Sequence, residues 1–344
     1  MKKIWCIPSN VKTNKYIELM QDAMQESGYY VYGSGRNLKK FFCDIIHLNW
    51  YEDIPNDKKY IYIYKLFFIY IMKLSGKRIV YTMHNKKPHD NKNKYSVKMM
   101  RHLLKLSDSI IIHSEISRDV IETNFKEIDL SKVKYIPHPN YINVYPPKKD
   151  YKNFHKHDNQ FVVAFVGQVR PYKNVEIILD VANKLMYNPE ITFLICGKCI
   201  SDDYKEGLLK MISGNNVRID FRFIEDDELD SLMQNIDILI LPYSTETALN
   251  SAAVILAMSF GKSIISTNVG TIQDFGNLPG ISYYDFPEDR EEHEKILEEK
   301  ILNFYKIWKN DREEFKKNGM DLKCIVERNN SKEIISKALK DVYL

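Results

Sequence analysis

The sequence predicts an α/β protein built from two Rossmann-like, doubly wound parallel-sheet domains in tandem. Short apolar segments recur along the 344 residues and are separated by stretches long enough for helices. This alternation is typical of parallel strands that are covered on both faces. It stops once, at PPKKDYKNFHKHDN (146–159), a polar, proline-led stretch without periodicity. A chain of this length also exceeds one ordinary core.

Each series of apolar segments predicts five strands. The first lies at 3–7, 44–48, 78–82, 109–113 and 134–136, and the second at 161–166, 191–196, 218–223, 238–241 and 263–266. We therefore expect a first domain over 1–147, a linker over 148–160 and a second domain over 161–328. Residues 329–344 read as a separate amphipathic helix with Ile334, Ile335, Leu339 and Val342 toward one side. The family resemblance described below implies that this helix packs back on the first domain.

Charge is divided unequally along the chain. Residues 1–160 carry 28 basic and 16 acidic side chains, which leaves 22 and 30 of the chain's 50 and 46 for the remainder. Such a basic half, with Tyr60, Tyr62, Tyr64 and Tyr70 interleaved, fits an anionic membrane surface. An ordinary solvated face is the alternative. No nucleic-acid-binding signature is present, so no nucleic-acid partner is expected.

Cysteine usage and the apolar stretches bear on the compartment. The five cysteines are scattered and odd in number, which favours a reducing environment. The pair Cys196 and Cys199 lacks a second pair, so core packing is favoured over a metal site. The start MKKIWCIPSN suits a first strand better than a signal peptide, and the stretch 60–74 is too short to span a bilayer. We expect a cytoplasmic protein, with peripheral association at the inner face of the plasma membrane.

The segment FVVAFVGQVRPYKNVEIILDVANKL (161–185) predicts an anion site. An apolar strand is followed by Gly167, which permits a sharp turn, and then by Arg170 and Lys173. We expect both cations in the first turn of the next helix, where unpaired N–H groups already favour negative charge. A guanidinium and an ammonium three residues apart fit a diphosphate. A solvated basic turn is the alternative.

Histidines gather where strands of the first domain are expected to end. They occur in HLNW (47–50), TMHNKKPHD (82–90), HSE (113–115) and PHPNY (137–141). Ligands of open parallel sheets bind beyond the carboxyl ends of the strands, so functional side chains are expected there. Each histidine taken alone is more often a hydrogen-bonded structural residue.

These motifs resemble those of GT-B-fold glycosyltransferases of the group 1, or family 4, type that build bacterial cell-surface polysaccharides. The second half of the chain carries further motifs of the same resemblance: FVGQVRPYKN, FLICGK, DILILPY and LAMSFGKSII. The resemblance covers most of the chain. It implies two Rossmann-like domains facing a cleft, with the acceptor on the first and a UDP- or GDP-linked sugar on the second. It also implies a lipid-linked or glycan acceptor, and neither a metal nor a cofactor beyond the donor.

The resemblance assigns roles to particular residues. Arg170 and Lys173 would neutralise the diphosphate leaving group. Gly167, Gly197 and Glu225 would border the nucleotide, although Glu225 could simply cap a helix. Asn250 and Ser251 precede a helix reaching about 260, and either backbone contacts to the distal phosphate or side-chain capping would suit them.

In the first domain, His84 and Asp90 are the catalytic candidates, with His89 and Glu52 as further possible bases. In an inverting enzyme, the base deprotonates the acceptor hydroxyl. In retaining relatives, a histidine at this place supports the donor sugar instead. The role of His84 is therefore open.

The chain departs from the family in one respect. Retaining members commonly carry two glutamates eight positions apart, and the matching positions here are Ala248 and Leu256. Glu246 is displaced by two residues. The departure keeps two alternatives in view: a sugar-nucleotide epimerase of the same fold, and a non-catalytic nucleotide-binding relative.

Overall fold

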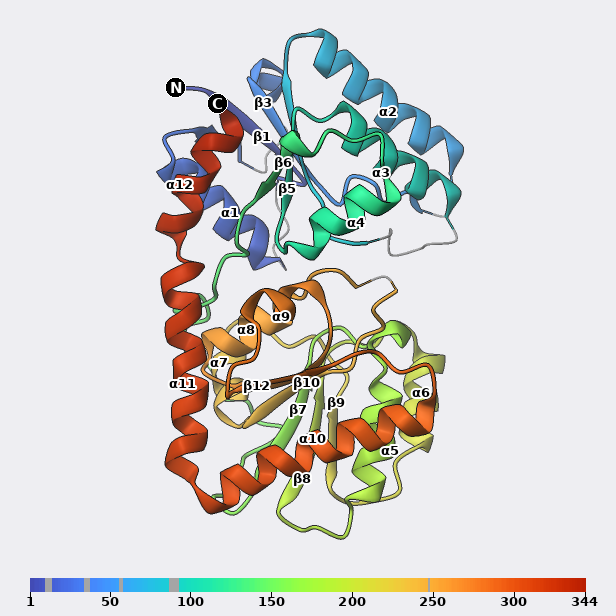
Figure 1. Ribbon diagram of the computed structural model, residues 1–344, viewed down its shortest axis with the longest axis vertical. Helices are drawn as coiled ribbons and strands as arrows, with labels where there is room; N and C mark the ends of the chain where they lie inside the picture. The colour runs from blue at the N-terminus through green and yellow to red at the C-terminus, as the bar shows by residue number, and fades with distance from the viewer. Residues whose placement is uncertain (10–13, 34–37, 56–57, 87–92, 247) are drawn as a thin grey trace. The chain divides into compact units, whose positions relative to one another are not determined.

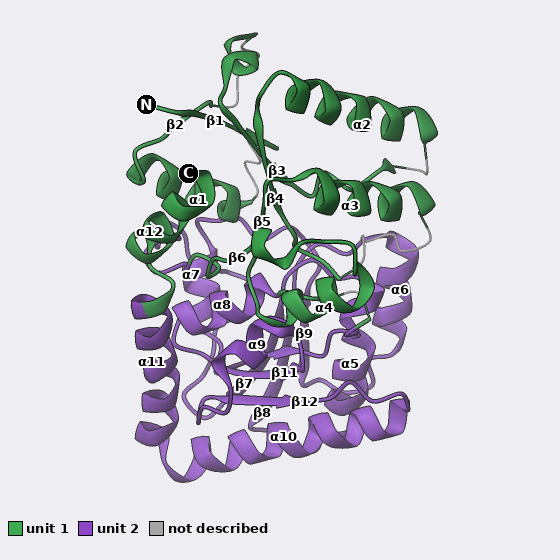
Figure 2. Ribbon diagram, turned by 45° about the horizontal axis from the view of Figure 1, so that its top comes forward, with its two compact units in different colours: residues 1–139, 246–250, 329–344 green, residues 140–245, 251–328 purple. Residues whose placement is uncertain are grey.

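The computed structural model describes residues 1–9, 14–33, 38–55, 58–86, 93–246 and 248–344. The chain forms two compact units (Figures 1 and 2). Unit 1 comprises Met1–Pro139, Glu246–Asn250 and Asn329–Leu344, and unit 2 comprises Asn140–Thr245 and Ser251–Arg328. Each unit is built around one six-stranded parallel sheet, so the predicted class of two doubly wound sheets is confirmed.

The sheet of unit 1 has the order β2-β1-β3-β4-β5-β6. Its strands are β1 (Lys3–Ile7), β2 (Tyr30–Val31), β3 (Ile45–Asn49), β4 (Arg78–Thr82), β5 (Ser109–Ile112) and β6 (Val133–Tyr135). The connecting elements are α1 (Lys15–Glu26), the 3₁₀ helix η1 (Leu38–Phe42), α2 (Lys59–Leu74), α3 (Lys94–Leu106), α4 (Ile116–Asn124) and the 3₁₀ helix η3 (Leu130–Lys132).

The last helix, α12 (Lys332–Tyr343), completes the core of unit 1. Ile335, Leu339 and Val342 are fully buried and share a cluster with residues of β1 and α1. The expected stripe differs in one position, because Ile334 is 44% exposed. Tyr343 is buried in its place, and its hydroxyl lies 2.7 Å from Nδ1 of His47.

The sheet of unit 2 has the order β12-β11-β10-β7-β8-β9. Its strands are β7 (Phe161–Val166), β8 (Ile191–Cys196), β9 (Val217–Asp220), β10 (Ile238–Leu241), β11 (Ser263–Thr267) and β12 (Ile281–Tyr284). The helical elements are the 3₁₀ helix η4 (Pro171–Lys173), α5 (Val175–Lys184), α6 (Asp202–Lys210), α7 (Leu229–Gln234), α8 (Ala252–Ser259), α9 (Gly270–Phe275), α10 (Arg290–Asn310) and α11 (Arg312–Asn329).

Five strands, β1, β4, β7, β8 and β10, have the predicted bounds. In β7, β8 and β10 every residue is buried, which accounts for their continuous apolar runs. The fully buried strands β3, β5 and β11 differ from the predicted bounds by one residue at one or both ends. Two strands were missed. β2 has only two residues, and β12 lies at the sheet edge with the half-buried pattern ISYY. The strand predicted over 218–223 ends earlier, at Asp220.

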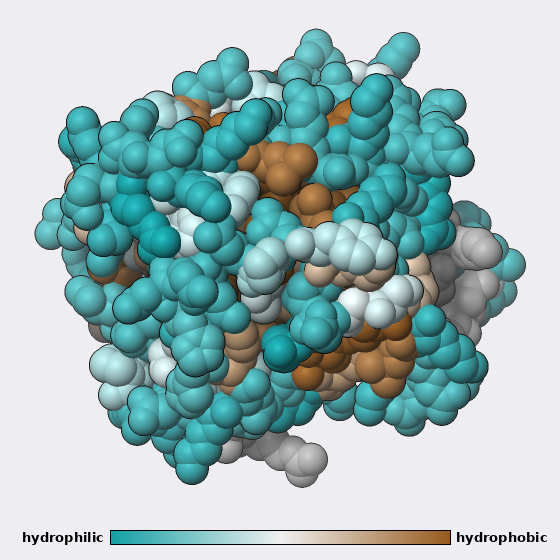
Figure 3. Space-filling model, turned by 90° about the horizontal axis from the view of Figure 1, so that it is seen from below, coloured by the Kyte–Doolittle hydropathy of each residue, from teal (hydrophilic) through white to brown (hydrophobic). Residues whose placement is uncertain are grey.

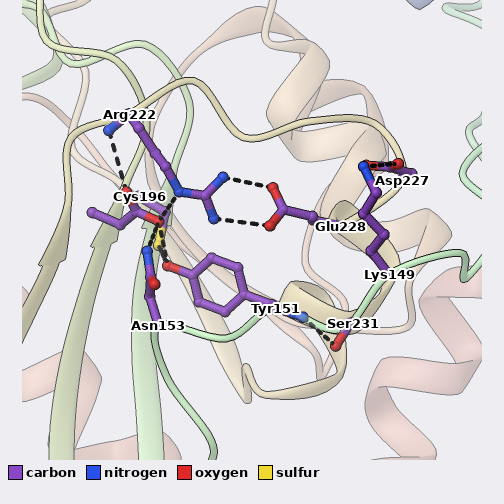
Figure 4. A network of polar contacts seen from close by, with 9 residues as sticks. Lys149, Tyr151, Asn153, Cys196, Arg222, Asp227, Glu228 and Ser231 are labelled. Atoms are coloured by element: carbon purple, nitrogen blue, oxygen red, sulfur yellow. Dashed lines mark hydrogen bonds and ion pairs between the residues drawn. The ribbon is translucent and has the colours of Figure 1, made fainter.

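The segment expected as a linker, 148–160, lies in unit 2. Tyr151 is fully buried, and its hydroxyl donates to Asp220 at 2.9 Å. Asp220 also accepts from Asn153 at 2.8 Å and pairs with Arg222 at 3.0 Å (Figure 4). Arg222 in turn forms a two-point ion pair with Glu228. These contacts attach the segment to the carboxyl end of β9.

No helix in the described part of the chain is long and apolar enough to cross a membrane. The face drawn in Figure 3 is mostly hydrophilic, and its apolar side chains gather in patches between polar ones.

The first turn after β7 depends on two glycines. The register pairs Val166 with Cys196, so the next residues of the two strands, Gly167 and Gly197, lie side by side. Both have left-handed backbone, with φ of +145° and +135°. A Cβ on Gly197 would lie 2.0 Å from the carbonyl oxygen of Gly167, a distance no side chain tolerates. The loop after β7 can therefore approach β8 only while residue 197 is glycine.

We expect Gly197→Ala to lower the free energy of unfolding by about 2 kcal/mol or more, because both the clash and the positive φ must be relieved. Gly207→Ala in α6 is the control, since a Cβ there meets nothing within 4 Å. Urea denaturation of both variants measures the difference. Equal midpoints would contradict the role given to Gly197.

Candidate functional site

The strand order of unit 2 has its switch point between β7 and β10. Chain order runs from β7 toward β8 and β9 on one side, and toward β10, β11 and β12 on the other. The order in which strands are added to the sheet therefore reverses between β7 and β10, while the strands stay parallel. Ligands of such sheets bind at the carboxyl ends of the strands at this point. The loops that follow β7 and β10 are consequently the first place to look for a site.

The loop after β7 differs from the prediction in one respect. Arg170 and Lys173 do not lie in the first turn of an α-helix. They flank and end the short 3₁₀ helix η4, and Asn174 then adopts a left-handed conformation (φ 51°) before α5 begins at Val175. The sequence signal for this break was Asn174, since asparagine tolerates this region better than most residues.

Contacts across the switch point hold the loop in place. The Asn174 side chain donates to the Pro242 carbonyl at 2.8 Å, and the Ser244 amide donates to the Tyr172 carbonyl at 2.8 Å. The loops after β7 and β10 are thus joined directly by hydrogen bonds.

Two aromatic rings lie near the ammonium group of Lys173 at this switch point. Its ammonium group is 5.5 Å from the ring centroid of Phe165 and 5.1 Å from that of Tyr243. It also lies 3.3 Å from where a Cβ on Gly167 would be. Burial, and to a smaller extent the nearby charge of Arg170, lowers the pKa of Lys173 to about 8. A bound anion would restore the ordinary preference for the charged form.

The two cations lack an acidic partner. The Arg170 guanidinium donates to the side-chain oxygen of Gln168 at 2.9 Å, a neutral group. Neither Arg170 nor Lys173 forms an ion pair with any residue that the structure describes. Two positive charges at the carboxyl end of β7 are therefore left for a ligand to neutralise.

The start of α8 adjoins this site through Tyr243. Ser251 is the N-cap residue of α8, but its side chain makes no capping hydrogen bond. Its hydroxyl lies near that of Tyr243, but both hydroxyls are buried without a hydrogen-bond partner among the described residues. The backbone amide of Ser251 donates to Oγ1 of Thr271 at 2.9 Å. Side-chain capping by Ser251, one of the two sequence-based alternatives, is thus wrong. The amides of the first turn of α8 remain available in principle, as at any helix start.

The other nucleotide candidates lie farther along. Gly197 is buried directly after β8, and Glu225 is exposed in the loop between β9 and α7. The carbonyl of Glu225 accepts from the amide of Glu228 at 3.0 Å, directly before α7 begins. Asn250 belongs to unit 1, where its side chain donates to the His84 carbonyl at 3.4 Å.

In unit 1, His84 lies directly beyond the end of β4 and is 8% exposed. Its ring stacks on Trp50 with centroids 4.0 Å apart and an angle of 14°. Nε2 of His84 lies 3.0 Å from Oδ1 of Asn49. An amide oxygen only accepts, so Nε2 carries the proton and Nδ1 is the basic nitrogen of the neutral ring.

The remaining strand-end histidines are structural. Nδ1 of His113 donates to the Ile136 carbonyl at 2.7 Å, and its Nε2 accepts from the Tyr16 hydroxyl at 2.8 Å. Burial lowers the pKa of His113 to about 4 and that of His138 to about 3. His47 lies within β3 rather than after it, and burial lowers its pKa to about 3. These rings are neutral packing groups around His84.

The other candidate bases are Asp90, His89 and Glu52. Asp90 and His89 lie outside the described residues. Glu52 is fully buried beside the hydroxyl of Tyr81, and burial raises its pKa to about 7. A carboxyl group without any exposed surface is poorly placed to meet an acceptor. Within the described residues, no group of three or more His, Cys, Asp or Glu side chains could hold a metal ion.

Sequence reasoning overlooked several residues of these sites. Tyr243, Asn174 and Thr271 in unit 2, and Asn49, Trp50 and Tyr16 in unit 1, are in contact with the predicted residues. Tyr243 and Trp50 each follow a strand, in DILILPY and HLNW. Their position after a strand was a usable signal.

Solved structures confirm the GT-B fold. The Anabaena protein Alr3699/HepE, in complex with UDP and glucose, matches with a TM-score of 0.70 at 14% identity, covering 99% of this chain and 98% of that one. A glycosyltransferase from Rickettsia africae ESF-5 gives a TM-score of 0.70 at 15% identity, covering 99% and 97%. The two parallel-sheet units of this chain thus have the GT-B fold.

The family model for glycosyl transferases group 1 matches residues 147–319, and the chain belongs to this family. A curated relative is the GDP-mannose:glycolipid 4-beta-D-mannosyltransferase of Xanthomonas campestris pv. campestris. It is 22% identical over 271 residues, covering 75% of this chain and 70% of the relative. The protein is therefore a glycosyltransferase, as predicted.

The lowered pKa of Lys173 makes anion binding depend on pH. The ammonium form is lost as pH rises through about 8, so affinity for a nucleoside diphosphate should fall by up to about tenfold per pH unit above this value. Without ligand, rising pH has the opposite effect on the stability of the protein. Because the unfolded lysine keeps its proton up to about 10.5, the free energy of unfolding should rise with pH between the two values.

Isothermal titration calorimetry from pH 7 to pH 10 measures the affinity, and urea denaturation over the same range measures the stability. Lys173→Met should lack both trends. A wild-type affinity independent of pH would contradict the burial of a titrating ammonium at the site.

Proposed function

We propose that this glycosyltransferase moves a hexosyl group from a UDP- or GDP-linked sugar to a lipid-linked or polysaccharide acceptor, in the synthesis of a cell-surface glycan such as capsule, exopolysaccharide or lipopolysaccharide. The observation that carries the donor assignment is the pair Arg170 and Lys173 at the switch point of unit 2, two cations that form no ion pair with any of the described acidic residues.

The reaction breaks the bond between the anomeric carbon and the diphosphate oxygen. The nucleoside diphosphate departs with the bonding electrons, the acceptor oxygen joins the sugar, and the acceptor hydroxyl loses its proton. Negative charge grows on the leaving diphosphate, where Arg170 and Lys173 stabilise it through charge-assisted hydrogen bonds of about 1.5 to 3 kcal/mol each. In this proposal the protein's own cations do the work that a metal ion does elsewhere, and no metal is used.

His84 is the proposed catalytic residue of unit 1. In an inverting reaction, Nδ1, the basic nitrogen defined by the contact with Asn49, takes the proton of the acceptor hydroxyl. In a retaining reaction, the same ring supports the donor sugar. The positions at which retaining relatives carry two glutamates hold Ala248 and Leu256 here, so neither stereochemical course is assigned.

The acceptor proposal draws on two observations. The curated relative from Xanthomonas campestris is named for transfer to a glycolipid. Residues 1–160 are strongly basic, which suits a protein that works at an anionic membrane surface. We therefore propose a peripheral location at the cytoplasmic face of the plasma membrane.

A thermal-shift panel of UDP, GDP, ADP, CMP and their common sugars tests the donor site. One nucleoside diphosphate should raise the melting temperature of the wild type, and Arg170→Ala with Lys173→Ala should abolish that rise. Losing two charge-assisted bonds corresponds to roughly 100-fold or more in affinity. Lys210→Ala, an exposed lysine at the end of α6, is the matched control.

Absence of any shift with millimolar nucleotides would overturn the donor assignment. Binding without turnover on any acceptor would instead favour a nucleotide-binding relative that has lost catalysis, and release of an epimerised sugar would favour an epimerase.

For His84, we expect His84→Ala to lower transfer at saturating donor by about 100-fold or more, the usual contribution of a positioned acid or base. Binding of the nucleoside diphosphate should persist, because Arg170 and Lys173 belong to unit 2. His102→Ala in α3 is the control. Unchanged transfer in His84→Ala, measured by release of nucleoside diphosphate, would remove His84 from the mechanism.

A further inference from the structure

One face of α2 in unit 1 is apolar and exposed along the length of the helix. Its exposed side chains are Tyr60 (66%), Ile63 (51%), Tyr64 (69%), Phe67 (62%), Tyr70 (44%), Ile71 (38%) and Leu74 (87%). They recur every three or four residues, so they form a single stripe on the helix. A soluble helix normally carries polar side chains there.

The opposite face of α2 is fastened to unit 1. Ile69 and Met72 are buried in the same cluster as residues of α3 and β4. Lys65 donates to the carbonyls of Tyr51 and Asp53 at 2.9 and 2.8 Å, and Lys73 pairs with Asp108 at 2.9 Å. The core of unit 1 is therefore packed by the buried face of α2, and the exposed stripe takes no part in it.

A second element extends this surface. The 3₁₀ helix η1 exposes Leu38 (80%), Phe41 (46%) and Phe42 (73%). The ring of Trp5 joins the two elements, since it lies edge-on to Phe41 at 5.4 Å and to Phe68 of α2 at 5.6 Å. We call the ten exposed side chains of α2 and η1 together the α2–η1 surface.

Charge on α2 itself has one sign. The sixteen residues of α2 include no aspartate or glutamate. Exposed Lys58 and Lys59 stand at its amino end, and Lys77 follows its carboxyl end. Apolar and tyrosine side chains bordered by lysines match the chemistry of an anionic lipid surface, with rings in the interface and ammonium groups near phosphates.

We propose that the α2–η1 surface inserts into the interfacial layer of an anionic lipid bilayer, with α2 lying in the membrane plane. Phe67, Ile63 and Leu74 enter the outer acyl region, while the tyrosine hydroxyls stay at the level of the headgroups. A second copy of this chain suits the surface less well, since a two-fold contact would set the same lysines near one another.

This inference deepens the proposed function, since a membrane-borne acceptor requires the enzyme at the bilayer. Lipid binding needs neither donor nor acceptor. A failure of the lipid experiment would therefore leave the sugar-transfer proposal standing, and a failure of transfer would leave the lipid result standing.

The test is flotation of the full chain with phosphatidylcholine vesicles, with and without phosphatidylglycerol. Wild type should bind only the anionic vesicles. Ile63→Ser, Phe67→Ser and Leu74→Ser combined should weaken binding by about tenfold or more, and so should Lys58→Glu with Lys59→Glu. Controls are Tyr187→Ser, an 84% exposed ring in unit 2, and Lys316→Glu with Lys317→Glu on α11.

Folding of each variant is checked by its melting temperature with and without nucleoside diphosphate. Wild type that ignores anionic vesicles, or α2 variants that bind like the controls, would overturn the proposal. Sedimentation equilibrium adds a third arm. A wild-type dimer that dissociates in the serine variants, without vesicle binding, would reassign the α2–η1 surface to self-association and likewise overturn the proposal.

Discussion

The contact between Gly167 and Gly197 underlies the candidate donor site. Register between β7 and β8 sets the two residues side by side, and a Cβ on Gly197 would lie 2.0 Å from the carbonyl oxygen of Gly167, in the space that the loop after β7 needs. With that space empty, the loop turns back and presents Arg170 and Lys173 beside β10. A backbone constraint of a few atoms thus decides where two positive charges lie.

The electrostatics of unit 2 follow from this arrangement. Lys173 is enclosed by Phe165 and Tyr243 and lies near a second cation, so its charged form is disfavoured until an anion arrives. Native proteins seldom leave two buried or half-buried cations without acidic partners unless a ligand supplies the charge. The two neighbouring cations lower the stability of the protein while the site is empty. A diphosphate that neutralises them removes this cost, and the free energy recovered adds to the binding affinity.

Unit 1 uses a different means to present one reactive group. His47, His113 and His138 are buried, hydrogen-bonded and neutral. His84 stands among them with its tautomer set by Asn49 and its plane set by Trp50. The neutral ring of His113 packs beside His84, with centroids 5.7 Å apart, and adds no positive charge there.

The sequence by itself determined the two-sheet class, most strand positions and the cationic loop, because continuous apolar runs and a glycine followed by cations are local signals. Tertiary structure alone decided the rest. It determined the enclosure of Lys173 by Tyr243, the Asn49 contact that selects the basic nitrogen of His84, and the burial of Glu52. Each depends on residues far apart in the chain, whose proximity is set by sheet order and register rather than by local pattern.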